Sequence, residues 1–264
     1  MDVYVHCNLP QFILQPRMDS MPALHQQLAP VFMPVRVIAP FDKPTPLASA
    51  GAGSARKARF WDRTAAQYAA DPIADMAGYE NTLRRVRGLL SADASVLEMG
   101  CGTGTTALRL APFTRRLLAT DVSARMIDIA REKLAAAPVP QLSFAVADAD
   151  TPFAGAGEYD AVLAFNLLHL VTDLDRALAL AVQALRPGGL LVSKTPCIAE
   201  LSVLIRWLAL PAMRALGRAP DVLRFDADTL QSAIARQGMA IEAVERHGTR
   251  GQDFRVFIVA RKPA

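Results

Sequence analysis

The fold is decided by one stretch of the sequence, Val96-Leu97-Glu98-Met99-Gly100-Cys101-Gly102-Thr103-Gly104. An apolar run passes here into three glycines at alternate positions, and a helical pattern begins near Thr105. Glycine lets the backbone turn tightly and lets a ligand approach where a Cβ would collide. The start of a helix presents unpaired N–H groups and a positive potential. This order predicts a ligand site beyond the carboxyl end of a parallel strand.

Apolar strands alternate with helical patterns on both sides of this loop. The expected strands are Ser95–Met99, Leu117–Thr120, Leu142–Ala147, Ala161–Phe165, Leu190–Thr195, Ala240–Val244 and Arg255–Ala260. The expected helices between them are Thr105–Leu110, Ser123–Ala136, Asp173–Leu185 and Ala227–Gln237. A turn at Pro187-Gly188-Gly189 is expected to end the third helix and lead into the next strand. This alternation predicts an α/β fold with a mostly parallel sheet, helices on both faces and a closing antiparallel hairpin.

Composition excludes several classes of protein. The chain has 264 residues, 52% of them hydrophobic, and 29 Lys+Arg against 25 Asp+Glu give a formal charge of +4. Such a chain is globular and not mainly disordered. Its weak charge does not favour a nucleic-acid partner. The three cysteines have no metal-ligand spacing, so we expect no metal site, and free thiols favour the cytoplasm. No apolar run is long enough to insert stably in a membrane.

Two segments differ from the rest of the chain. Residues 1–54 hold eight of the 18 prolines, and we expect a poorly ordered N-terminal extension before a domain over residues 55–264. Helical signals mark two stretches of residues 55–90, at Ala55–Ala70 and Asn81–Leu90. The segment 197–220 is an apolar helical insertion that contains Trp207 and Pro211. Four roles are open for this insertion: a cap over an apolar pocket, a membrane-surface contact, core packing, or an oligomer contact in a homodimer.

The spacing of the glycines excludes two common phosphate loops. A G-x-G-x-x-G fingerprint that starts at Gly100 needs glycine where Thr105 stands, and no Gly-Lys-Ser/Thr follows for a Walker A loop. Asp121 ends the next strand, where a carboxylate suits ribose hydroxyls. Asp148 follows the third strand and is able to accept from an adenine amine, with Asp150 as the alternative.

These residues together resemble the class I S-adenosylmethionine-dependent methyltransferases of small molecules, over roughly residues 57–262. The residues that carry the resemblance are Glu98 to Gly104, Asp121, Asp148, the strand Tyr159–Asn166 and Leu185-Arg-Pro-Gly-Gly189. The resemblance implies a Rossmann-like seven-stranded sheet with an antiparallel last strand, S-adenosylmethionine as cofactor, and N-terminal lid helices. It implies cofactor contacts from Tyr68, Glu98, Gly100, Gly102, Gly104, Asp121, Met126, Asp148, Ala149 and Asn166.

The resemblance also implies the reaction, an in-line transfer of a sulfonium methyl to a small, hydrophobic acceptor through O, S, N or C. Such a transfer needs alignment and no nucleophile on the protein, so we expect Cys101 only to pack in the loop. A general base helps when the acceptor carries a proton, and His169 and His247 are the candidates. The alternatives are a nicotinamide-dependent oxidoreductase and a non-catalytic nucleotide-binding protein.

Overall fold

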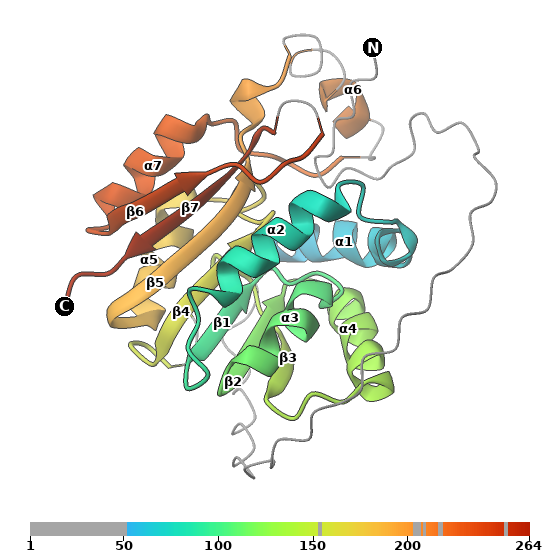
Figure 1. The fold of residues 1–264 in the computed structure, drawn as a ribbon. Helices are drawn as coiled ribbons and strands as arrows, with labels where there is room; N and C mark the ends of the chain where they lie inside the picture. Colours follow the sequence, from blue (N-terminus) through green and yellow to red (C-terminus); the bar gives the residue numbers. More distant parts are fainter. Residues whose placement is uncertain (1–51, 153–154, 203–206, 208–209, 216–218, 251–252) are drawn as a thin grey trace.

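One seven-stranded sheet forms the centre of the molecule (Figure 1). The computed structural model describes residues 52–152, 155–202, 207, 210–215, 219–250 and 253–264, so most of the extension and parts of the 197–220 insertion lie outside the described residues. The strands are β1 Ser95–Met99, β2 Arg116–Asp121, β3 Leu142–Val146, β4 Tyr159–Phe165, β5 Leu185–Pro196, β6 Ala240–Glu245 and β7 Arg255–Arg261. Their order is β3-β2-β1-β4-β5-β7-β6, with β7 antiparallel to both neighbours. The predicted fold is confirmed.

Helices cover both faces of the sheet. Helices α2 (Met76–Arg87), α3 (Thr105–Leu110) and α4 (Ala124–Ala136) bury apolar residues on one face, while α5 (Leu174–Ala184) and α7 (Ala227–Arg236) pack on the other. Helix α1 (Ala52–Ala70) lies against α4 (Figure 1). The remaining elements are the 3-10 turns Ala111–Phe113 and Ile198–Glu200 and the short helix α6 (Leu210–Ala215). Two apolar layers therefore enclose the sheet.

The strand order places the glycine loop at a switch point of the sheet. From β1 the chain continues to β2 and β3 on one side, then crosses to β4 on the other side of β1. The carboxyl ends of β1 and β4 therefore diverge into loops that leave in different directions. Ligands of open α/β sheets bind in the crevice at such a point.

Two boundaries differ from the sequence prediction. Helix α2 begins at Met76, five residues before the predicted start at Asn81, because the carboxylate of Asp75 accepts a hydrogen bond from the Gly78 N–H at 2.9 Å and caps the helix. Strand β5 begins at Leu185, so the predicted turn at 187–189 lies inside it. The pairing with β4 jumps there from Leu185 to Leu190, which accommodates the turn as an irregularity within the strand.

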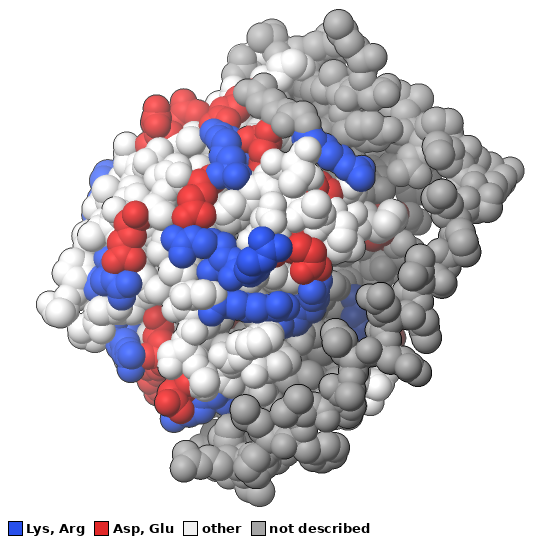
Figure 2. Space-filling model, in the orientation of Figure 1, with Lys and Arg blue, Asp and Glu red and all other residues white. Residues whose placement is uncertain are grey.

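Charges of both signs share the surface around α2. Figure 2 shows basic and acidic side chains side by side on this face. Arg85 pairs with Glu245 at 2.9 Å, and Arg109 pairs with Glu80. Exposed pairs of this kind contribute about 0–1 kcal/mol each. Within the described part of the chain, no helix has both the length and the apolar character that crossing a membrane requires.

Candidate active site

Two cavities open at the carboxyl ends of the central strands. The first, of about 100 Å³, surrounds the glycine loop, and we call it the loop cavity. The second, of about 390 Å³, lies beneath α1 and α2, and we call it the helix cavity. Both are lined by Trp61, Tyr68, Cys101, Thr106, Phe165 and Asn166. Because they share these residues, a ligand in one cavity lies next to a ligand in the other.

The glycines of the loop have two different roles. Gly102 has a φ of +54°, its N–H donates to Asp121 Oδ2 at 2.9 Å, and a Cβ there would meet nothing closer than the Tyr68 ring at 3.5 Å. Its open side faces the loop cavity. Gly104, at φ +74°, lines neither cavity, and a Cβ there would lie 2.6 Å from the Phe144 ring. The structure therefore does not support a cofactor contact for Gly104, which instead lets the loop pack closely against Phe144 of β3 and Ala130 of α4.

Asp121 is held firmly at the edge of the loop cavity. Its Oδ2 accepts from the Gly102 N–H and its Oδ1 from the Ser123 N–H, both at 2.9 Å. Burial raises the pKa of this carboxyl to about 6, although the two backbone hydrogen bonds oppose the rise. A carboxylate has about four acceptor positions, so each oxygen retains one for a ligand hydroxyl. The geometry fits a ribose with two adjacent hydroxyls.

Glu98 places an unsatisfied acceptor in the same cavity. Its side chain is 2% exposed, and Oε2 has no hydrogen-bond partner among the described residues. Burial, and then the nearby Asp121, raise the pKa of Glu98 to about 8. An unmade hydrogen bond of a buried group costs about 1–3 kcal/mol. A ligand with a cationic donor, such as an amino-acid ammonium, satisfies this oxygen.

The end of the loop cavity that holds Asp148 is contacted by α1. Asp148 and Ala149 both line the loop cavity, whereas Asp150 does not. The Asp148 carboxylate accepts from the Ser54 hydroxyl and from Lys57 Nζ at 2.7 Å, and Lys57 also pairs with Asp150 at 2.5 Å. The first turns of α1 therefore cover the carboxylate that the sequence predicted as the adenine acceptor.

Three other residues expected to contact the cofactor line the loop cavity, and two of them, Tyr68 and Asn166, also line the helix cavity. Met126 lines the loop cavity, and Tyr68 lines both cavities with its ring edge-on to Trp61 at 6.3 Å. Asn166 has a φ of +52°, a left-handed conformation in which asparagine is enriched, and its N–H donates to the Lys194 carbonyl at 2.7 Å. Tyr68, from α1, and Asn166, just after β4, therefore both line the junction of the two cavities.

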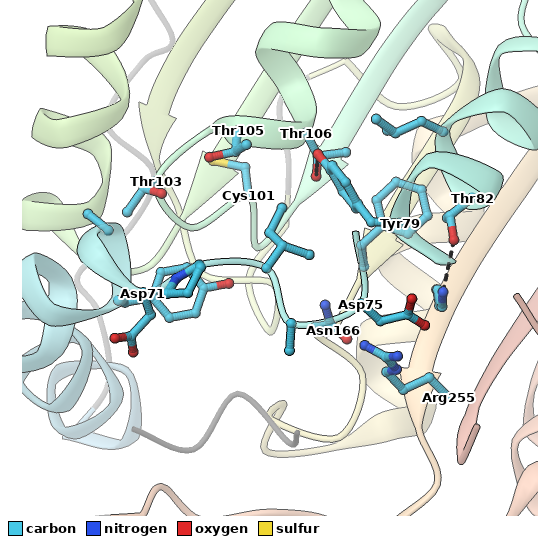
Figure 3. Close-up of a pocket in the computed structure, with 18 of the residues that line it drawn as sticks. Asp71, Asp75, Tyr79, Thr82, Cys101, Thr103, Thr105, Thr106, Asn166 and Arg255 are labelled. Atoms are coloured by element: carbon cyan, nitrogen blue, oxygen red, sulfur yellow. Dashed lines mark hydrogen bonds between the residues drawn. The ribbon is translucent and has the colours of Figure 1, made fainter. Parts of the chain in front are cut away.

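A polar group of residues lines one end of the helix cavity. Figure 3 shows Asp75, Thr82 and Arg255 at this end and Cys101, Thr103 and Thr105 at the other. Lys194, from β5, also lines the cavity, and its Nζ donates to Thr82 Oγ1 at 2.8 Å.

None of the four residues of the polar end was predicted from the sequence as a site residue: Asp75, Thr82, Lys194 and Arg255. One signal was present: Lys194 belongs to an expected central strand, and lysine is almost never fully buried without a partner.

The structure does not support His169 as a general base. Its side chain is 1% exposed, it lines neither cavity, and burial lowers its pKa to about 3. His247 also lines neither cavity, but its Nδ1 lies 3.0 Å from Thr82 Oγ1, behind the polar end of the helix cavity. Cys101 is buried, and burial raises its thiol pKa well above the usual value, so it remains a protonated thiol.

The strand order and the glycine loop define a Rossmann-like fold, and comparison with known proteins shows which family it resembles. Residues 96–189 match a family model described as a methyltransferase domain. The chain is 28% identical over 196 residues to an O-methyltransferase of Penicillium expansum, covering 69% of this chain and 64% of that protein. It is 35% identical over 85 residues to a magnesium-protoporphyrin O-methyltransferase of Rhodobacter capsulatus, covering 31% and 37%.

A solved structure agrees in fold. An S-adenosylmethionine-dependent methyltransferase from Mesorhizobium loti superposes with a TM-score of 0.59 at 22% identity, over 70% of this chain and 98% of that one. The family model identifies residues 96–189 as a methyltransferase domain, and the described residues have the Rossmann-like fold of class I S-adenosylmethionine-dependent methyltransferases. The chain spans less than two thirds of the length of the two relatives named above.

Proposed function

We propose that this protein transfers a methyl group from S-adenosylmethionine to a small organic acceptor that binds in the helix cavity. The observation that carries the proposal is the junction of the two cavities at Tyr68, Cys101, Phe165 and Asn166. A donor in the loop cavity is thereby next to an acceptor in the helix cavity. The volume of about 390 Å³ falls within the range of about 300–1,000 Å³ that is typical of small-molecule sites.

Each part of the donor has a group in the loop cavity that fits it. Glu98 would accept from the amino-acid ammonium, Asp121 from the ribose hydroxyls, and Asp148 with Ala149 would contact the adenine. When bound, S-adenosylmethionine supplies a methyl group that its positive sulfur has already activated. The protein's own residues then have to align the acceptor and exclude water, and such positioning can lower the activation barrier by about 7–11 kcal/mol.

The helix cavity favours an acceptor with one apolar and one polar side. Trp61, Ile73, Leu83 and Phe165 supply apolar surface, while the far end is polar. An aromatic or other flat apolar body fits between these side chains. We therefore infer a small acceptor that carries a polar group on the hydrophobic body expected from the sequence, and the names of the two O-methyltransferase relatives support an oxygen atom as the methyl acceptor.

Calorimetry with S-adenosylhomocysteine tests the donor site. The wild type should bind, and Asp121→Asn should bind at least tenfold more weakly, because a hydrogen bond to a charged group contributes about 1.5–3 kcal/mol. Asp128→Asn, on the exposed side of α4, is the matched control and should bind like the wild type. Equal affinities for Asp121→Asn and the control would contradict the donor placement.

A screen of hydroxylated aromatic compounds with S-adenosylmethionine, scored by mass spectrometry for an added methylene mass, then tests transfer. A donor that binds without any transfer across the screen would count against this acceptor class.

A further inference from the structure

A lysine lies on the wall of the helix cavity and is part of a chain of hydrogen bonds. Lys194 is 7% exposed and lines the cavity, and its Nζ donates to Thr82 Oγ1 at 2.8 Å. Thr82 Oγ1 lies 3.0 Å from His247 Nδ1, and His247 Nε2 lies 2.8 Å from Glu245 Oε2. The side chain of Glu245 is 30% exposed and also accepts from Arg85. The four side chains therefore connect the cavity to the surface without a gap.

The donors and acceptors in this chain have a consistent direction. The Glu245 carboxylate can only accept, because its pKa lies below the ordinary value, so His247 Nε2 carries a proton and Nδ1 is free to accept. The Thr82 hydroxyl can turn between two acceptors, the Gly78 carbonyl at 2.9 Å and His247 Nδ1. Thr82 can therefore take a proton from Lys194 on one side and give its own to His247 on the other.

The charges around Lys194 allow both protonation states. The charged groups that face it are the Asp75 and Asp253 carboxylates and the Arg255 guanidinium. Burial, and then Arg255, lower the pKa of Lys194 to about 8, while the two carboxylates oppose the shift. The amine is therefore partly neutral near pH 8, where a neutral amine can accept a proton.

We propose that Lys194 is the general base that takes the proton from a hydroxyl of the acceptor, and that Thr82, His247 and Glu245 carry a proton onward to the surface. This rests on the proposed function. The substrate class is then a compound with an ionisable hydroxyl, such as a phenol, whose ring lies against Trp61 and whose hydroxyl reaches the lysine. His247, expected from the sequence as the base, becomes a relay residue.

The step balances in atoms and charge. The acceptor oxygen forms its bond to the methyl carbon as the bond from that carbon to sulfur breaks, and the sulfur retains the electron pair as a neutral thioether. The hydroxyl proton moves to Lys194 Nζ. Lys194 then gives a proton to Thr82 Oγ1 while Thr82 gives its own to His247 Nδ1. His247 releases its Nε2 proton through Glu245 to water and is left protonated at Nδ1. Exchange with water returns the ring to its Nε2-protonated tautomer before the next turnover, so one proton leaves for each methyl group transferred.

Carbon-13 NMR of lysine-labelled protein tests the base without any acceptor. The chain has five lysines, Lys43, Lys57, Lys133, Lys194 and Lys262, and the signal of Lys194 is assigned by its loss in Lys194→Met. We expect Lys194 to titrate with a pKa of about 8. Titration near the ordinary value of 10.5 would overturn the proposal even where S-adenosylhomocysteine binds as expected. Failure of that ligand to bind would instead refute the proposed function.

Kinetics with an acceptor from the screen test the relay. Lys194→Met should lower kcat about 10²–10⁴-fold while leaving the affinity for S-adenosylhomocysteine unchanged. Thr82→Val removes the hydroxyl at nearly constant shape and should lower kcat at least tenfold, whereas Thr82→Ser should restore it. His247→Asn is a second break in the chain and should flatten the rise of kcat with pH. Wild-type kcat and pH profiles in both Thr82→Val and His247→Asn would refute the relay.

Discussion

The replacement of Glu98 by glutamine separates the charge of this residue from its shape. Glu98 is buried, and its pKa rises from 4.5 in water to about 8 in the folded protein. At about 1.4 kcal/mol for each tenfold change in an equilibrium constant, ionising Glu98 in the folded protein costs about 5 kcal/mol more than in the unfolded chain. Glutamine fills the same space and carries no charge at any pH.

The sign of the effect follows from proton binding. Because the folded state holds the Glu98 proton more tightly, this residue's contribution to stability is complete below pH 4.5 and is lost as pH rises through about 8. We therefore expect Glu98→Gln to match the wild type near pH 4.5 and to exceed its free energy of unfolding by about 3 kcal/mol at pH 7 and about 5 kcal/mol at pH 9. S-adenosylhomocysteine should bind the variant about tenfold more weakly, because the ligand ammonium loses its carboxylate partner.

Urea unfolding followed by circular dichroism at pH 5, 7 and 9, without ligand, measures this difference. Glu132→Gln is the matched control, because it makes the same chemical change on an exposed position of α4. The control should follow the wild type at every pH. If Glu98→Gln and the wild type show the same dependence of unfolding free energy on pH, Glu98 is not a buried titrating group and the assignment of its free oxygen to a ligand cation fails.

Two further substitutions test the loop and the helix above it. Gly104→Ala should destabilise the protein by about 2–4 kcal/mol in thermal unfolding, because its φ of +74° is unfavourable for alanine and the new methyl would collide with Phe144. Gly53→Ala, where a Cβ meets nothing within 4 Å, should remain within about 0.5 kcal/mol of the wild type. Lys57→Met should speed S-adenosylhomocysteine association several-fold in stopped-flow tryptophan fluorescence, because it releases α1 from Asp148. An unchanged association rate would mean that α1 does not limit access.

The sheet could be predicted from the sequence because each strand carries its own signal. Apolar runs bounded by glycine and proline define the strands one by one, and the connecting helices make the central strands parallel. The loop around Gly102 and the carboxylate of Asp121 were found for the same reason, since both follow directly from the end of a strand. The start of α2 was missed because a cap by Asp75 depends on a side-chain hydrogen bond rather than on periodicity.

The histidine predictions depended on position along the chain, which does not determine where a side chain points. His169 follows the end of β4, yet its ring turns into the protein and away from both cavities. His247 lies in the connection between β6 and β7, and it reaches Thr82, 165 residues earlier in the sequence, because β7 pairs antiparallel with β5 and brings that connection beside α2. Such contacts require the register of the whole sheet.

Lys194 shows how a break in a local pattern points to chemistry. It pairs in register with Phe165 of β4 and Phe257 of β7, in a stretch of β5 in which every residue is buried. With its pKa lowered from 10.5 to about 8, its ammonium form at neutral pH costs about 3 kcal/mol of folding free energy. A methionine would occupy the same strand position without that cost, so packing gives no reason for a lysine here. The position of Lys194 on the cavity wall gives a reason for a lysine, because an amine beside Thr82 can exchange a proton with a hydroxyl that binds in the cavity.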